Sequence, residues 1–440
     1  MIKGNSMHSQ SGHIDSHYSA TAAHLPTFGQ LASAKGTHAQ VCIIGGGLAG
    51  LTAALELARA GRDVILLEGK RMGWAASGRN GGFVSGGFAE SILTIEKRLG
   101  LDHARELYRL SVEGVGHIRN TIRENAREDI IGGQGWLKMI RHARVAELEQ
   151  RAERMARDYG VQYTLLSQRE LEPYVSSNSY HAGLLDMGPF HIQPLDYAVL
   201  LAGQAAAHGA RLHENSRVIS IERLDGGNWE VRTGNGSVRC EHVVVATSAY
   251  GGPVQRINRA ILPVATYVVT ARSQKLDEAI RFSGCLGDTR RAGDYYRIVG
   301  KGDERRLLWG GRITTRTSVP ARLGEALKRD IQGVYPQLDD LVIERKWAGL
   351  MGYCVHKMPL IGQMMPGLWP LTGFGGHGLN TTAMGGYLIA SAITGGDDRW
   401  RLFEPFRVQW GGGLAGRVAT QLEYWRLQIA DRFEEMRAGK

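Results

Sequence analysis

The sequence predicts an α/β fold in which a Rossmann-type dinucleotide-binding domain is interwoven with an α+β substrate domain carrying a mixed or antiparallel sheet. Three observations support this prediction. First, the glycine-rich segment GGGLAG (45–50) lies between an apolar run and a helical pattern. Second, another buried strand, HVVVATSAY (242–250), follows far downstream. Third, amphipathic helices and strand candidates separate these two segments. The 440 residues are enough for two domains of ordinary size.

The first element is a complete β-α-β unit. AQVCIIG (39–45) is a short apolar run typical of a buried parallel strand. LTAALELARAG (51–61) has helical spacing with glycine as its stop, and DVILLEG (63–69) supplies the second strand. Glu68, about 20 residues after the glycines, is placed to accept hydrogen bonds from ribose hydroxyls. We therefore expect a dinucleotide site here.

Each residue type in the glycine-rich segment has a mechanical role. Gly45 makes the turn, Gly47 lets the backbone approach a pyrophosphate, and Gly50 allows close packing of helix and strand. The unpaired N–H groups where the helix begins, at Leu48 and Ala49, then face the phosphates.

GGGLAG occurs a second time at 411–416 in a different setting. FEPFRVQW before it carries a proline and charges, and one amphipathic helix follows it to the chain end. Without a second strand, these glycines are expected to form a bend before a C-terminal docking helix within 401–440.

Composition limits the possible partners. The formal net charge is +10, but the arginines are scattered, and no basic stripe with interleaved aromatics points to a nucleic acid. The four cysteines, which never form C-x-x-C, favour neither a disulfide framework nor a metal site.

No export signal or membrane span is expected. Residues 1–38 lack the apolar core of a secretory signal and are interpreted as an N-terminal arm of a cytoplasmic protein. The apolar stretch 41–58 contains the glycine turn and stops at Arg59, which fits a strand-turn-helix better than a membrane helix.

The segment after Glu68 favours FAD over NAD. GKRMGWAASGRNGG (69–82) is rich in small residues that suit an extended cofactor, and with GGGLAG it resembles the D-amino-acid-oxidase-like superfamily of FAD enzymes. WAASGRNGG (74–82) resembles γ-glutamylputrescine oxidases in particular, and the likeness continues through LTGFGGHGLNTTAMGG (371–386) over nearly the whole chain. Cys354 does not match the spacing of covalently flavinylated sarcosine oxidases, so FAD is expected to bind non-covalently.

The resemblance implies further cofactor contacts. Val218 is expected to offer backbone contacts to the adenine, and the glycine-rich turn before the last long helix is expected to face the flavin. Beyond the residues named above, the implied cofactor-binding set is Gly69, Arg71, Ala76, Ser77, Gly78, Arg79, Asn80, Gly81, Gly82, Val218, Ala246, Thr247, Gly375, Gly376, His377, Gly378, Leu379 and Asn380.

The expected domains are discontinuous. After the N-terminal arm, the FAD-binding domain is assigned to 39–92, 191–251 and 347–400, and the substrate domain to 93–190 and 252–346.

The expected reaction is hydride transfer from a carbon bearing an amine, which depends on positioning and on a neutral amine more than on a strong base. Glycine and D-amino-acid oxidases carry an arginine after W-x-G-L, where this chain has Met351. Sarcosine oxidases place a lysine after G-H-G-x, where this chain has Asn380. An amine without an adjacent carboxylate is therefore favoured.

Four side chains are candidates for the reaction site. Arg312 could hold a carboxylate, Tyr296 and Trp347 could wall the amine, and His377 could contact the flavin. Tyr295, next to Tyr296, is a further residue that could belong to the wall around the amine.

The predicted function is FAD-dependent oxidation of an amine C–N bond to an imine that water hydrolyses. The substrate would be γ-glutamylputrescine or a similar polyamine derivative, and the electron acceptor oxygen or a carrier. Two alternatives stay open: oxidation of a cyclic or N-alkyl amino acid such as pipecolate, proline or a sarcosine-like compound, and modification of tRNA, for which no basic stripe is present.

Overall fold

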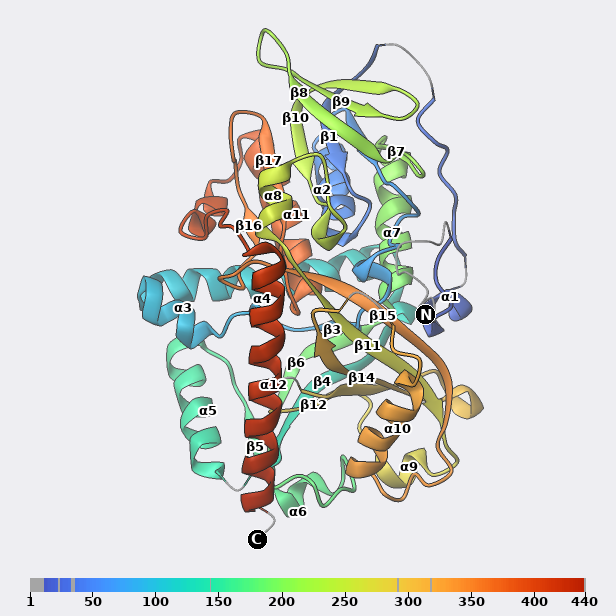
Figure 1. The fold of residues 1–440 in the computed structure, drawn as a ribbon, viewed down its shortest axis with the longest axis vertical. Helices are drawn as coiled ribbons and strands as arrows, with labels where there is room; N and C mark the ends of the chain where they lie inside the picture. The colour runs from blue at the N-terminus through green and yellow to red at the C-terminus, as the bar shows by residue number, and fades with distance from the viewer. Residues whose placement is uncertain are drawn as a thin grey trace.

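The computed structural model describes residues 12–22, 24–32, 36–142, 144–290, 293–316 and 319–438. Two sheets organise the chain, one in the upper half and one in the lower half of the molecule as drawn in Figure 1. The first eleven residues of the predicted N-terminal arm lie outside the described ranges.

The first sheet is the predicted Rossmann-type sheet. Its central path runs β16-β17-β10-β1-β2-β7, and β1 pairs in parallel with both β10 and β2. The pair β8–β9 extends it in antiparallel fashion from β10. Its strands are β1 (Thr37–Ile44), β2 (Val64–Leu67), β7 (Arg211–His213), β8 (Val218–Arg223), β9 (Trp229–Thr233), β10 (Ser237–Val245), β16 (Leu360–Ile361) and β17 (Leu368–Thr372).

Both faces of this sheet are covered, which explains why β1 is apolar without alternation. Val41 and Ile43 join the core under the helices, whereas Cys42 and Ile44 point into the core on the opposite face. The covering helices are α2 (Leu48–Arg59), α7 (Pro194–Ala207) and α11 (Gly378–Thr394).

Small residues bring α2 and α11 together. A Cβ on Gly386 would lie 2.6 Å from Cβ of Thr52 on α2, so only glycine permits this approach. Gly114 on α4 (Leu101–Glu124) plays the same part, because its Cβ would meet the backbone oxygen of Asn380 at 2.2 Å. These contacts fix the beginning of α11 beside α2.

The second sheet has the order β15-β11-β14-β13-β12-β4-β6-β3, with β5 beside β6. It is mixed, as predicted: β12 and β4 are parallel, and its other pairs are antiparallel. Its strands are β3 (Phe83–Val84), β4 (Ile131–Ile140), β5 (Thr164–Ser167), β6 (Ala182–Ile192), β11 (Leu262–Arg272), β12 (Cys285–Asp288), β13 (Tyr295–Val299), β14 (Arg306–Thr314) and β15 (Val342–Tyr353).

The chain crosses between the sheets at points that differ from the expected boundaries. β3 belongs to the second sheet although it falls within the first expected segment, 39–92. β15 stays in the second sheet through Tyr353, so the return to the first sheet comes at β16 and not at residue 347. Length and periodicity alone do not reveal which sheet a strand joins.

The remaining helices surround this frame. They are α1 (His17–Thr21), α3 (Ile92–Leu99), α5 (Val145–Tyr159), α6 (Gln168–Leu171), α8 (Gln255–Ala260), α9 (Leu276–Ala279), α10 (Leu323–Val334) and α12 (Gly413–Ala438). Within the described ranges, no helix combines the length and apolar character needed to cross a bilayer.

The second GGGLAG brings its first and last glycines together as the first copy does, but its backbone differs, because Gly412 and Gly413 have φ of 81° and 56° whereas only Gly45 has positive φ in the first copy. A Cβ on Gly416 would lie 1.9 Å from the oxygen of Gly411, and a Cβ on Gly50 would lie 2.0 Å from the oxygen of Gly45. The second copy leads directly into α12 and follows no strand. It contributes nothing to the pocket described below.

Candidate functional site

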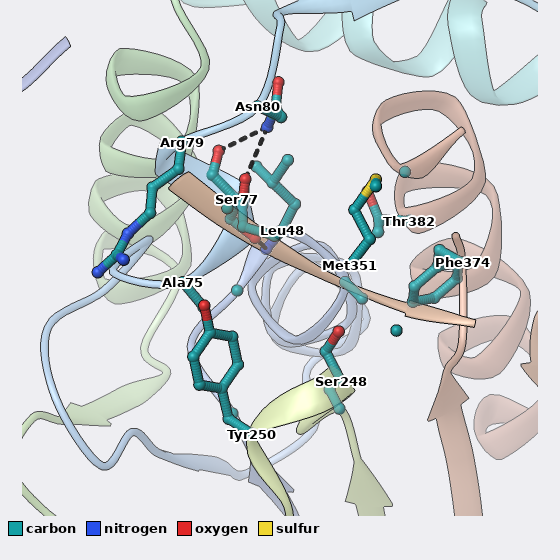
Figure 2. A pocket seen from close by; sticks show the side chains of 18 of the residues that line it. Leu48, Ala75, Ser77, Arg79, Asn80, Ser248, Tyr250, Met351, Phe374 and Thr382 are labelled. Atoms are coloured by element: carbon teal, nitrogen blue, oxygen red, sulfur yellow. Dashed lines mark hydrogen bonds between the residues drawn. The ribbon is translucent and has the colours of Figure 1, made fainter. Parts of the chain in front are cut away.

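A pocket of about 500 Å³ lies between the two sheets. Its walls come from the carboxyl ends of β1, β2 and β10, from the segment after β2, from the beginning of α11, and from β11, β13 and β15. Figure 2 shows Leu48 and Ser77 near its centre, with Met351 and Phe374 on one side and Arg79 and Tyr250 on the other. Ligands of open α/β sheets bind at such carboxyl ends.

The first GGGLAG shapes the wall at the beginning of α2. Gly45 has φ of 114°, and a Cβ there would lie 2.5 Å from the oxygen of Ala246 at the end of β10. The Leu48 N–H donates to Oγ of Ser77 at 2.9 Å. Two strands and a helix therefore meet closely, and the Leu48 N–H, which the sequence predicts to be unpaired, is instead bonded to Ser77, a residue that also lines the pocket.

Glu68 ends β2 at the pocket wall. Its carboxylate accepts hydrogen bonds from the N–H groups of Gly46 and Lys70, each at 2.7 Å. Burial raises the pKa of Glu68 against the effect of these donors. The carboxylate is thus fixed beside the turn, where a ribose hydroxyl would be recognised.

The segment 76–82 is held by bonds to its backbone. Asn80 donates to the oxygens of Ala76 and Ser77, at 3.0 and 2.9 Å (Figure 2). From outside, Trp347 donates to the oxygen of Arg79 at 2.9 Å and Tyr18 to that of Asn80 at 2.7 Å.

Arg79 is the most unusual polar group of the wall. It is only 2% exposed, its Nε donates to the oxygen of Trp74 at 2.7 Å, and its guanidinium stacks 4.2 Å from the Trp74 ring centroid. Burial lowers the pKa of Arg79, and its Nη2 lacks a partner among the described residues. A buried N–H of this kind suits an anionic or carbonyl group of a ligand.

The glycine-rich turn before α11 forms the opposite wall. Gly375 has φ of 59°, and its Cβ would lie 2.7 Å from the Cβ of Ala89. His377 caps the helix, and burial together with the charge of Lys138 lowers its pKa to about 4. The imidazole is therefore neutral at physiological pH. Asn380 donates to the oxygens of Gly87 and Ser111, at 2.9 and 3.3 Å.

Aromatic rings close the end of the pocket toward the second sheet. Tyr295 makes edge contacts with Phe83, whose ring also meets Trp136, each pair with centroids 5.7 Å apart. Two glycines leave room for Tyr295: a Cβ on Gly81 would lie 2.6 Å from its ring, and one on Gly310 would lie 2.0 Å away. Tyr353, Phe374 and Met351 continue this wall.

Three of the four predicted reaction-site side chains lie elsewhere. Tyr296 is fully buried behind the sheet, bonded to Tyr180 and Tyr335 at 2.9 and 2.8 Å, because neighbouring residues of a strand point to opposite faces and Tyr295 takes the pocket side. Trp347 is 2% exposed and supports Arg79 from behind.

Arg312 is directed away from the pocket for an electrostatic reason. Its Nε lies 2.5 Å from a carboxylate oxygen of Asp330 on α10. With φ of 54°, Arg312 occupies the left-handed region, and the following Ile313 lines the pocket instead. Of the predicted reaction-site residues, His377 does line it.

The predicted cofactor contacts meet in one place with few exceptions. Those that line the pocket are Gly45, Gly47, Leu48, Ala49, Glu68, Gly69, Ala76, Ser77, Arg79, Asn80, Gly81, Gly82, Val218, Ala246, Thr247, Gly375, Gly376, His377, Gly378, Leu379 and Asn380. Gly50 and Gly78 do not line the pocket but allow the backbone behind its wall to pack closely. A Cβ on Gly50 would lie 2.0 Å from the oxygen of Gly45, and one on Gly78 would lie 2.5 Å from that of Gly73. Arg71 pairs instead with Glu214, at 2.7 Å.

Sequence reasoning missed the aromatic wall other than Tyr295. Phe83 directly follows Gly81 and Gly82, and Trp136 directly follows Gly135 in β4. Nothing in the sequence around Trp136 indicates that β4 lies beside the pocket. The pairing of β4 with β6 and β12 decides that.

The residues present fit the expected cofactor FAD, a dinucleotide whose flavin ring carries hydrogen-bonding groups. Besides Nη2 of Arg79, the buried polar atoms Oγ1 of Thr247 and Nε1 of Trp136 face this pocket and have no hydrogen-bond partner among the described residues. Glycine backbone at both helix beginnings leaves space for close approach. Cys354 is buried but is not among the residues that line the pocket.

Comparisons with known proteins also indicate an FAD-dependent enzyme. Residues 40–392 match the family model described as "FAD dependent oxidoreductase" (DAO). The chain is 32% identical to "Gamma-glutamylputrescine oxidoreductase" of Escherichia coli K12, over 89% of this chain and 91% of that protein. It is 31% identical to "Probable oxidoreductase OrdL" of Haemophilus influenzae, over 90% of this chain and 93% of that one.

Solved structures show the same fold. The chain superposes on L-proline dehydrogenase from P. horikoshii with a TM-score of 0.70 and 19% identity, over 85% of this chain and 100% of that one. It superposes on glycine oxidase from Geobacillus kaustophilus with a TM-score of 0.70 and 22% identity, over 85% and 99%.

Proposed function

Because the chain belongs to the DAO family of FAD-dependent oxidoreductases, we propose that it oxidises the C–N bond of an aminoalkyl group such as the putrescine part of γ-glutamylputrescine. The cofactor is FAD, as the sequence predicts, and the relatives of this family act on amines and amino acids. When bound, FAD supplies the acceptor for two electrons and a proton equivalent. The protein positions the amine against the flavin, excludes water from it and selects the substrate.

One observation carries the choice of substrate. The wall formed by Phe83, Trp136, Tyr295, Phe374 and Met351 contains no guanidinium or carboxylate. Met351 lies in it at the position where amino-acid oxidases of the resembled group carry a carboxylate-binding arginine. This supports an amine whose reacting carbon has no carboxylate attached.

The other cations that line the pocket are Lys70, Arg79 and Arg217. Nζ of Lys70 lies 5.8 Å from the ring centroid of Trp74. Arg217 lies next to Gly69, whose Cβ would come within 3.5 Å of it, at the end expected for the adenosine. The guanidinium of Arg79 stacks on the ring of Trp74, on the opposite side of the pocket from Met351 (Figure 2). None of the three is placed beside the aromatic wall.

The wall also sets the protonation state of the amine. Aromatic faces attract an ammonium group at entry, whereas burial among them lowers its pKa and favours the neutral form. The one carboxylate among the described residues that line the pocket is Glu68, beside the α2 turn. His377 is neutral above about pH 4. Proton loss from the amine is thus driven by desolvation and not by a strong base.

Lys138 is not among the residues that line the pocket, but it lies on the same face of β4 as Trp136, and we propose it as a contact for the far end of the substrate. Its Nζ lies 6.0 Å from the ring centroid of Trp136, and burial lowers its pKa to about 8, which keeps most of its charge at pH 7. A γ-glutamyl group carries a carboxylate remote from the reacting amine, which suits this cation. Putrescine alone has none.

Arg312 was the residue that favoured the alternative of a cyclic or N-alkyl amino acid, and it could equally have held the carboxylate of a γ-glutamyl group. The ion pair of Arg312 with Asp330 removes the main support for that alternative.

The test is anaerobic reduction of the purified holoprotein. The flavin absorbance near about 450 nm is followed after separate additions of γ-glutamylputrescine, putrescine, L-pipecolate, glycine, sarcosine and D-alanine. Bleaching by the γ-glutamyl amine at the lowest concentration supports the proposal, and preferential bleaching by pipecolate or sarcosine overturns it. Readmission of oxygen then distinguishes an oxidase, which recovers its colour and forms peroxide, from a dehydrogenase that needs a carrier.

A further inference from the structure

The face of the second sheet that carries Trp136 also carries charged side chains. Strands β12, β4 and β6 lie side by side in this sheet (Figure 1). Trp136 is the register partner of Asp186 on β6, and Lys138 is the partner of Leu184. Because register partners share a face, as do residues two apart on one strand, Trp136, Lys138 and Asp186 all stand on the same face. An acid and a base therefore flank the indole that lines the pocket.

A row of residues across the sheet connects Lys138 to the aromatic wall. Tyr295 pairs with Gly287 on β12, and Gly287 pairs with Lys138 on β4. Gly287 adds no side chain between them, and a Cβ there would lie 3.5 Å from Nε1 of Trp136. After burial, the charge of Lys138 is the second cause that lowers the pKa of the pocket residue His377. Lys138 is therefore a near neighbour of the pocket.

The charges of Asp186 and Lys138 are not neutralised by the described residues, and the two groups form no ion pair with each other. The described residues offer the Asp186 carboxylate one hydrogen bond, from the N–H of Gly188 at 2.9 Å. Burial raises the pKa of Asp186 and, together with the charge of Arg151 on α5, lowers that of Lys138 to about 8. Both shifts disfavour the charged form, so each group would gain from a ligand group of opposite charge.

Two tyrosine hydroxyls accompany Asp186. Tyr108 and Tyr163 are half-buried, and burial raises the pKa of each, to which the charge of Asp186 adds. Within the part of the chain that the structure describes, neither hydroxyl is hydrogen-bonded. A Cβ on Gly86 would lie 3.5 Å from the hydroxyl oxygen of Tyr108, and Gly86 directly follows the pocket residue Ser85. Free hydroxyl oxygens beside a carboxylate suit a ligand ammonium, which has three hydrogens to donate.

The length of the row matches the length of a γ-glutamyl amine. Two strand spacings place the backbone of Lys138 about 10 Å from that of Tyr295. In γ-glutamylputrescine, eight bonds separate the reacting carbon from the carbon that carries both the ammonium and the carboxylate, and an extended chain of this kind spans about 9–10 Å. An amine that reacts beside Tyr295 would thus place its two distant charges near Lys138.

We infer that Lys138 and Asp186 bind an α-amino acid group at the far end of the substrate, Lys138 its carboxylate and Asp186 its ammonium, with Trp136 against the chain between the two ends. The inference rests on the proposed function, because it assigns the end of the amine opposite the reacting carbon. A substrate with only one of the two charges leaves the other protein group unpaired. The substrate class is then the γ-glutamyl amines, as distinct from free diamines and acetylated polyamines.

The first experiment compares four amines that share the reacting aminobutyl end. γ-Glutamylputrescine carries both distant charges, N-glutarylputrescine only the carboxylate, N-γ-aminobutyrylputrescine only the ammonium, and N-acetylputrescine neither. Anaerobic rapid mixing with the holoprotein gives the second-order rate constant of flavin reduction for each. We expect the γ-glutamyl amine to exceed each singly charged amine by about tenfold or more, and N-acetylputrescine to be slowest.

The second experiment assigns each charge to its residue. Asp186→Asn should lower the rate constant about tenfold for the two amines that carry the ammonium and leave N-glutarylputrescine within about twofold. Lys138→Met should instead affect the two amines that carry the carboxylate. Each variant is compared with itself on different substrates, so a loss of folded protein or of FAD cancels. Asp225→Asn and Lys97→Met make the same changes at exposed positions and should leave all ratios unchanged.

Two results overturn the inference and leave the proposed function standing. One is flavin reduction at equal rates by γ-glutamylputrescine and N-acetylputrescine. The other is a loss of rate in Asp186→Asn or Lys138→Met by the same factor for all four amines, which would assign these residues a structural role. If none of the four amines reduces the flavin, the proposed function itself fails, and the inference fails with it.

Discussion

The hydroxyl of Tyr18 donates to the backbone oxygen of Asn80 at 2.7 Å, so a residue before the first strand holds a segment of the pocket wall. Arg297 in turn donates to the Tyr18 hydroxyl at 3.1 Å and contacts Nδ1 of His191 at 2.5 Å. This buried chain of polar groups connects the N-terminal arm, β13 and β6 behind the expected cofactor site.

We expect Tyr18→Phe to destabilise the holoprotein by about 1–2 kcal/mol, because the oxygen of Asn80 and a nitrogen of Arg297 lose a buried partner. FAD should also dissociate faster from the loosened wall. Thermal unfolding and flavin release after dilution measure the two effects. Tyr174 does not line the pocket, so Tyr174→Phe, which also removes one hydroxyl, serves as the control; equal effects of both variants would contradict the assignment.

The repeated hexapeptide permits a matched comparison. Gly50→Ala places a Cβ 2.0 Å from the oxygen of Gly45, and Gly416→Ala places one 1.9 Å from that of Gly411. Both bring a Cβ against the oxygen of the first glycine of the hexapeptide. Only Gly50→Ala should lose FAD, measured as the ratio of flavin to protein absorbance in the purified protein. Equal FAD loss in the two variants would show that general destabilisation is responsible.

Gly310→Ala should displace Tyr295, since the new Cβ would lie 2.0 Å from its ring. Overpacking of this kind costs about 1–3 kcal/mol, so kcat/KM for the amine should fall at least tenfold while FAD is retained. Tyr295→Phe keeps the ring and removes only the 3.2 Å contact with Thr266, so its effect should be small. Anaerobic reduction rates compare the two.

The pH dependence should follow the substrate and not His377. Because the pKa of His377 is lowered to about 4, its proton is already lost above pH 5, and kcat/KM should rise with pH as the amine deprotonates. His377→Gln should change the height of this profile but not the position of its acid limb. An acid limb near pH 6 to 7 that disappears in His377→Gln would contradict the lowered pKa.

Met351→Arg should shift selectivity toward amino acids by adding a guanidinium to the aromatic wall. We expect the ratio of reduction rates for sarcosine over γ-glutamylputrescine to rise at least tenfold relative to Met351→Leu, which keeps the apolar volume. Rapid-mixing spectroscopy of the flavin gives both rates. An unchanged ratio would mean that the residue at 351 does not face the reacting carbon.

The dinucleotide-binding half could be predicted because its signals are local. Gly45, Gly47 and Glu68 lie within one β-α-β unit, and the turn before α11 is marked by its glycines and by the family resemblance.

The reaction side depended on information that is not local. Whether Tyr295 or Tyr296 faces the pocket depends on the register of β13 against β14, and Arg312 turns away because α10 brings Asp330 to it. Phe83 and Trp136 meet only through the pairing of the second sheet. Such contacts between distant segments leave little trace in a single sequence.

The residues that line the pocket run along the chain from Ile44 to Thr382. During synthesis the ribosome adds residues at a rate that separates these two points by on the order of tens of seconds. The β1–α2 unit is therefore synthesised well before α11, and the pocket is complete only once α11 has emerged from the ribosome. FAD binding is thus expected late in the synthesis and folding of the protein. Any truncation before α11 should yield a colourless polypeptide however well its first half folds.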